Sequence, residues 1–211
     1  MTAYVSPSIT SAFVTLLATI GPIETAVLFA SLTSGVHRPE RTTLALRSVL
    51  IAGIVLLAFA LGGAPVLDYL HVSVPAFQVA GGIMLFLQAL TLVFSSPGLS
   101  SISEGEKKAA RSLGDIAVFP LAFPVIASPG ALVAVVLLMG RAKDMVEGGA
   151  ILAMLVSCLL LTYIAMRAGE ILTRWLGQTG ADVAGRIMGV LLAGLAVQFV
   201  FDGIRGGFIT S

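Results

Sequence analysis

The sequence predicts an all-α integral membrane protein built from two inverted repeats of three helices each. Three observations lead to this fold class: composition, a series of long apolar stretches, and a motif that occurs in both halves. Hydrophobic residues make up 57% of the 211 residues and charged residues 11%, whereas soluble domains carry about 25% charged residues. Lipid is therefore the expected solvent for most of the chain.

Six apolar stretches are long enough to be transmembrane helices. Each has about 20 mostly apolar residues, which suffices to cross a hydrocarbon core about 30 Å thick. The predicted spans are Ile9–Leu32, Thr43–Leu61, Val74–Phe94, Ile116–Met139, Gly149–Met166 and Val183–Phe201.

The evidence for a repeat is a short motif in the third and sixth spans. Val79–Met84 and Val183–Met188 agree at five of six positions at an offset of 104 residues. Pro22 in the first span and Pro129 in the fourth are related by a similar offset of 107. Because each repeat has an odd number of spans, the second copy must cross the membrane in the opposite direction.

This repeat divides the chain into three parts. Residues 1–98 are the predicted first repeat, 99–115 a cytoplasmic connector, and 116–211 the second, inverted repeat. In the connector, Ser103 and Glu106 have the spacing of a capping box and predict a short surface helix.

The distribution of basic residues predicts the orientation. Nine of the twelve Lys and Arg residues follow spans one, three and five, and cytoplasmic loops collect such residues. Both termini are therefore expected on the non-cytoplasmic side. The formal net charge of +1 gives no reason to expect a nucleic-acid partner.

The first span of each repeat is predicted to be broken at its proline. Pro22 lacks a backbone donor and follows Gly21, so either a break or a simple kink is expected there. Ser128 and Pro129 are suited to the N-cap and first position of a new half-helix. In hydrocarbon a broken helix is tolerated only where it is buried in protein or lines a cavity. Because both halves have such a proline, the internal repeat favours breaks that serve a function over simple kinks.

Two half-helices that begin in mid-membrane would point free N–H groups into the protein and favour an anion such as a carboxylate. Nearby hydroxyl groups are candidates to bind the same substrate. The predicted substrate-binding residues are Thr19, Gly21, Pro22, Glu24, Thr25, Ser128, Pro129 and Gly130.

Glu24 is the one carboxylate within these breaks, and a charge at membrane depth indicates function. The sequence allows three roles: a proton-coupling group, a counter-charge for an amine or cation, or a cap for the helix that Pro22 begins. The structural alternative is a capping carboxylate that faces a water-filled vestibule.

Other classes of protein are less well supported. The single cysteine, Cys158, excludes a disulfide within the chain. No metal site, cofactor or catalytic constellation is predicted inside the membrane, so we expect no enzyme. A cation exporter would need several intramembrane carboxylates or histidines. A membrane-embedded scaffold without transport activity stays open.

Four segments make the chain resemble the MarC family. They are Phe29–Gly35, Pro75–Leu87, Asp115–Pro124 and Ser128–Ala131. The resemblance implies a protein of the bacterial cytoplasmic (inner) membrane that transports small neutral amino acids such as glycine or alanine, coupled to H⁺ or Na⁺.

The chain departs from this family in its first span. Where many members have Asn-Pro-Ile-Gly, this chain has Gly21-Pro22-Ile23-Glu24. The substrate, direction of transport and coupling ion stay open. The glycine-rich faces of spans three and six suit packing within one chain or within a homo-oligomer.

Overall fold

The computed structural model describes residues 9–33, 36–94 and 116–209, and this part of the chain is built from helices alone. The predicted connector, including its capping box, lies outside the described residues. An all-helical fold is expected in lipid, because a helix satisfies its own backbone hydrogen bonds.

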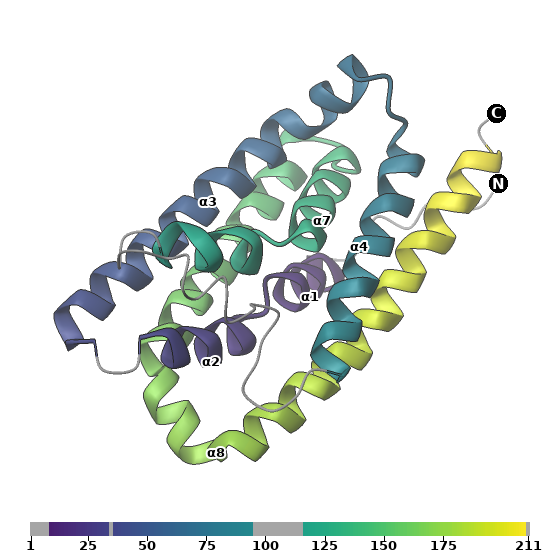
Figure 1. Ribbon diagram of the computed structural model, residues 1–211. Coiled ribbons are helices and arrows are strands. Elements are labelled where there is room, and N and C mark those ends of the chain that lie inside the picture. Colours follow the sequence, from purple (N-terminus) through teal and green to yellow (C-terminus); the bar gives the residue numbers. More distant parts are fainter. Residues whose placement is uncertain (1–8, 34–35, 95–115, 210–211) are drawn as a thin grey trace.

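Within the described residues, seven helical elements follow one another along the chain (Figure 1). In the first half they are α1 (Ile9–Ile20), α2 (Pro22–Leu32), α3 (Arg38–Tyr69) and α4 (Val74–Phe94). In the second half they are η1 (Ala117–Ile126), α7 (Pro129–Gly140) and α8 (Met145–Ile209).

In the part of the chain that the structure describes, five stretches are long and apolar enough to cross a bilayer. One of them contains both α1 and α2. The pair η1 and α7, bent by 54° at its break, gives a sixth span if the two helices cross as one. The described residues therefore give five spans, or the predicted six if the bent pair counts as one span, and the first span is itself interrupted at Gly21.

The predicted loop between spans five and six is wrong. Helix α8 runs from Met145 to Ile209 and contains both apolar stretches, 145–169 and 189–208. Its backbone stays helical through the polar stretch between them and curves, so that the end of α8 rises beside α4 (Figure 1). The polar segment that was predicted to be a loop is thus part of a continuous helix.

Helix η1 is irregular because two prolines interrupt it. Phe119 and Phe123, each preceding a proline, have extended backbone angles. The N–H of Ala127 donates to the carbonyl of Ala122 at 2.9 Å, a wide turn that closes the helix. Proline cannot supply the regular backbone donors, which explains the irregularity.

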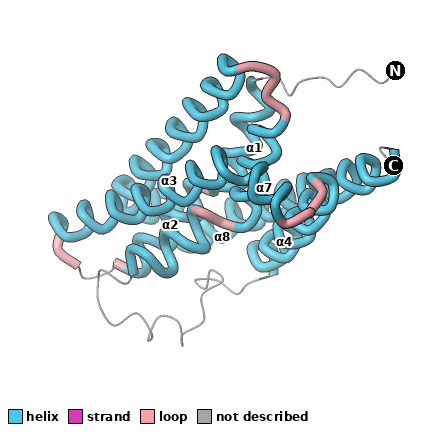
Figure 2. Tube along the Cα trace, turned by 90° about the horizontal axis from the view of Figure 1, so that it is seen from above, coloured by secondary structure: helices cyan, strands magenta, loops and turns pink. Residues whose placement is uncertain are grey.

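The main core lies among α1, α2, α3, η1, α7 and the first part of α8. A smaller cluster joins α4 to the later part of α8 through Leu85, Ala89, Leu192 and Ala196. Figure 2 shows α4 and the end of α8 together at one side of the bundle.

Glycines allow α4 and α8 to approach closely. A Cβ on Gly82 would lie 2.8 Å from the carbonyl oxygen of Ala196, and one on Gly203 would lie 2.8 Å from that of Pro75. These contacts place the small-residue faces of spans three and six against each other within one chain, as small residues commonly pack in membranes.

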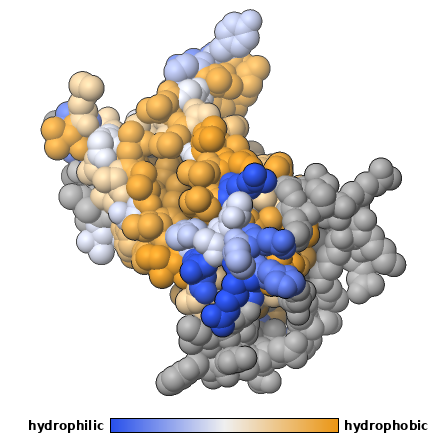
Figure 3. Space-filling view, turned by 90° about the vertical axis from the view of Figure 1, so that its left-hand side faces the viewer, coloured by the Kyte–Doolittle hydropathy of each residue, from blue (hydrophilic) through white to orange (hydrophobic). Residues whose placement is uncertain are grey.

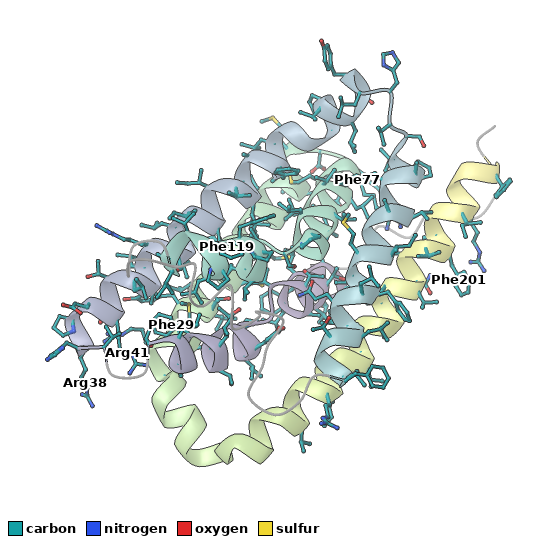
Figure 4. The ribbon with its side chains drawn as sticks, in the orientation of Figure 1. Phe29, Arg38, Arg41, Phe77, Phe119 and Phe201 are labelled. Carbon is teal, nitrogen blue, oxygen red and sulfur yellow. The ribbon has the colours of Figure 1, made fainter. Side chains whose placement is uncertain are left out.

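The surface separates into an apolar belt and a polar end. Large apolar side chains such as Ile54, 67% exposed, cover the outside of α3, as expected for a lipid-facing helix. Hydrophilic residues gather at the end where α3 begins (Figure 3). There the guanidinium of Arg41 lies 5.6 Å from the ring centre of Phe29 (Figure 4), and Arg167 of α8 donates to the Thr42 hydroxyl.

Candidate functional site

The break between α1 and α2 occurs at Gly21. This residue has left-handed backbone angles, φ 59° and ψ 63°, and Pro22 begins the next helix. Glycine adopts this conformation without the steric cost that a Cβ would add. The structure therefore has a true interruption at the predicted position, where a proline kink was the alternative.

Hydroxyl groups satisfy two carbonyl groups that this break leaves without a helical partner. The Ser128 hydroxyl donates to the carbonyl of Thr19 at 3.0 Å. The Thr25 hydroxyl donates to the carbonyl of Ile20 at 3.4 Å. Such pairing is what keeps an interrupted helix stable away from water.

The second break, between η1 and α7, has the predicted capping geometry. Ser128 is the N-cap, with φ −67° and ψ 156°, and its hydroxyl oxygen accepts from the N–H of Ala131 at 3.1 Å. Pro129 follows as the first helical residue. The sequence prediction of this half-helix start is confirmed.

The two breaks meet inside the protein. Ser128 and Thr19 lie 109 residues apart in the chain, and both side chains are buried. One hydroxyl, that of Ser128, thus caps α7 and joins it to the end of α1. Gly130 completes the contact on the other side, since a Cβ there would lie 2.3 Å from Cδ1 of Leu85 on α4.

The three predicted hydroxyl residues all donate to backbone carbonyls. Thr19 donates to the carbonyl of Thr15 at 2.8 Å, and Thr25 and Ser128 donate across the break as described. Their protons are therefore used in stabilising the interrupted helices, and only their oxygens are left to accept a bond from a ligand. Substrate binding by these residues stays a prediction.

Glu24 lies in the first turn of α2 and is half-buried. A Cβ on Gly21 would lie 3.3 Å from Glu24 Oε2, so the carboxylate curls back toward the break. Among the described residues its carboxylate has no hydrogen-bond or ionic partner. The cap that the sequence allowed does not form in this structure, and the carboxylate is available to a ligand or proton.

Replacing Gly21 with alanine is expected to destabilise the break. The left-handed conformation costs a residue with a Cβ about 1–2 kcal/mol, and the added carbon would press on the Glu24 carboxylate. Thermal unfolding in detergent measures the loss. Asparagine, which tolerates this conformation, should restore part of it.

The control for Gly21 is alanine at Gly62 of α3, where an added Cβ meets no atom within 4 Å. Equal stability of the Gly21→Ala and Gly62→Ala variants would contradict the strained geometry assigned to Gly21.

Two polar residues of α4, Gln78 and Gln88, were not among the predicted site residues. Gln78 is 5% exposed. Gln88 is half-buried, and its Oε1 is shielded from solvent without a hydrogen-bond partner, the one such side-chain atom among the described residues. An amide inside a predicted apolar span is a sequence signal that points to such residues.

Metal-binding clusters are absent from the described residues: no three His, Cys, Asp or Glu side chains come together. Cys158 is buried and free. The chemistry that the described residues offer at the junction is that of backbone dipoles, hydroxyl oxygens and one carboxylate.

The helix lengths, their apolar surfaces and the interrupted pair define the chain as an integral multi-pass membrane protein. Comparison with known families identifies the kind of membrane protein more closely. The MarC family of integral membrane proteins matches residues 6–208, and the chain belongs to that family.

Relatives from bacteria and archaea cover nearly the whole chain. A UPF0056 membrane protein of Methanocaldococcus jannaschii is 32% identical over 198 residues, which are 94% of this chain and 96% of the relative. The UPF0056 inner membrane protein YhgN of Escherichia coli is 30% identical over 201 residues, covering 93% and 96%. No solved structure matches the chain.

Proposed function

We propose that this protein is a secondary transporter of small neutral amino acids such as glycine or alanine, which works by alternating access without a covalent step. The observation that carries the proposal is the buried meeting of two interrupted helices through Ser128 and Thr19. Interrupted helices that meet near the membrane centre are a recurring design of substrate sites in secondary transporters.

A carboxylate fits the start of α2 in this proposal. The N-cap Gly21 has no side chain to cap the helix, so the first-turn N–H groups and the positive end of the helix dipole favour an anion. The start of α7 differs, because Ser128 already caps Ala131. The substrate carboxylate is therefore assigned to α2.

Two inverted repeats of three helices, 1–98 and 116–211, supply the alternating motion in this proposal. The two half-helices that begin with Pro22 and Pro129, one in each proposed repeat, support this arrangement. The protein is proposed to lie in the cytoplasmic (inner) membrane, and the distribution of its basic residues supports an orientation with both termini on the non-cytoplasmic side.

Glu24 is proposed to couple transport to H⁺ or Na⁺. Its carboxylate lies beside the break and lacks a partner among the described residues. A proton or cation bound there would neutralise a charge that has no other partner among the described residues.

Uptake of labelled glycine and alanine into proteoliposomes tests this function. We expect saturable uptake that a proton or sodium gradient accelerates, and we expect Glu24→Gln to abolish the acceleration while counterflow persists. Glu147→Gln is the matched control, because it changes a half-buried carboxylate at the start of α8 that already accepts a bond from the Lys143 N–H. Absence of amino-acid flux under every gradient would refute the proposal.

An exporter of amines or cations is the second candidate. The unpaired carboxylate of Glu24 favours it, because a cation would give that group a partner. Labelled methylammonium in the same vesicles separates the two candidates: its transport without amino-acid flux supports the exporter. A scaffold would carry neither.

A further inference from the structure

The side-chain amide of Gln88 has an oxygen whose hydrogen bonding is unsatisfied in the part of the chain that the structure describes. It lies within the apolar span 74–91 of α4, and its Oε1 is buried without a hydrogen-bond partner among the described residues. A buried acceptor left unpaired loses its hydration without compensation and so destabilises the folded state. Such a group in a folded protein calls for a partner, and the described residues do not supply one.

The register of α4 places Gln88 beside the junction of the two breaks. A Cβ on Gly81 would lie 2.3 Å from Val133, and Leu85 contacts Gly130 at the first turn of α7. Gly81, Leu85 and Gln88 share one face of α4, spaced as i, i+4 and i+7. Gln88 is therefore the next position on this face, at the level just before α7 begins.

The end of α1 reaches the same level. Ala18 packs against the cluster that contains Leu85 and Ala89, and the neighbouring Thr19 carbonyl accepts the Ser128 hydroxyl. The α4 face at Gln88 thus borders the place where the two interrupted helices meet.

We propose that Gln88 recognises the substrate, and that its amide oxygen accepts a hydrogen bond from the substrate's ammonium group. This inference rests on the proposed transport function. An amide oxygen is a pure acceptor, so it complements an N–H donor and leaves the substrate carboxylate to the start of α2. Gln88 would then select amino acids over the corresponding acids that lack the amine.

The test compares alanine uptake by wild-type protein with that by Gln88→Met, which keeps the length of the side chain and removes its acceptor. We expect KM for alanine to rise about ten- to hundredfold with little change in maximal rate, as for loss of a hydrogen bond to a charged group. Inhibition by propionate, which lacks the amine, should stay unchanged.

Two further variants separate recognition from structure. Gln88→Glu keeps an acceptor and should transport alanine with a KM closer to that of wild type than Gln88→Met. Gln78→Met changes another buried amide of α4 and should leave KM within about threefold, since it removes no unpaired acceptor.

The KM values and the inhibition by propionate together decide the role of Gln88. An unchanged KM in Gln88→Met, or an equal loss of alanine and propionate recognition, overturns the role of Gln88 while the transport function stands. If Gln88→Met fails to fold, the KM of Gln88→Glu decides: a value near wild type supports recognition, and loss of discrimination against propionate overturns it. Absence of alanine flux in wild-type protein overturns the transport function itself.

Discussion

Replacing Ser128 with alanine should cause the largest loss of stability among single hydroxyl deletions in this protein. The change removes the cap of α7, worth about 1 kcal/mol, and leaves the buried carbonyl of Thr19 without its donor, at about 1–3 kcal/mol. We expect a loss of about 2–4 kcal/mol from the two effects together. Transport should fall as well, because both half-helices lose their shared contact.

Thermal unfolding of the purified protein in detergent, together with alanine uptake, measures both effects. Ser128→Thr keeps the hydroxyl and should retain more stability than Ser128→Ala. The matched control is Ser157→Ala, which removes an exposed hydroxyl that bonds only the preceding turn at Ala153. If Ser128→Ala and Ser157→Ala unfold at the same temperature, the junction does not depend on Ser128.

The positions of the two breaks could be predicted because their causes are local. Pro22 and Pro129 lack backbone donors wherever they stand in a helix. Ser128 before Pro129 matches the chemistry of a helix start, and the observed cap has that geometry. A short sequence window therefore contained the necessary information.

The partners across the junction could not be predicted in the same way. The bond from Ser128 to Thr19 joins residues 109 positions apart, and no local rule specifies which carbonyl a hydroxyl meets. The sequence consequently assigned Thr19, Thr25 and Ser128 to the substrate, whereas their protons stabilise the backbone.

The course of α8 was missed for a different reason. The polar residues between its apolar stretches resemble a loop in composition, yet none of residues 170–188 is a proline. Glu170, Arg174 and Gln178 are good helix formers. Charge determines which side of the membrane this segment faces, but charge alone does not end a helix. The helix accordingly continues through the turn.

Alanine at Gly82 is expected to separate α4 from α8. The new Cβ would lie 2.8 Å from the carbonyl oxygen of Ala196 and 3.0 Å from the backbone nitrogen of Val200. Backbone atoms cannot rotate away as a side chain can, so one helix must shift. Overpacking of this kind costs about 1–3 kcal/mol, which should appear as a lower unfolding temperature.

Gly194→Ala isolates the packing term, because an added Cβ there meets no atom within 4 Å. Both substitutions replace a helical glycine by alanine and share the gain in helix propensity, about 1 kcal/mol. The difference between the two unfolding temperatures therefore reports the contact with α8 alone. Equal temperatures would mean that α4 and α8 do not pack through Gly82, and that the small-residue face is free for another chain.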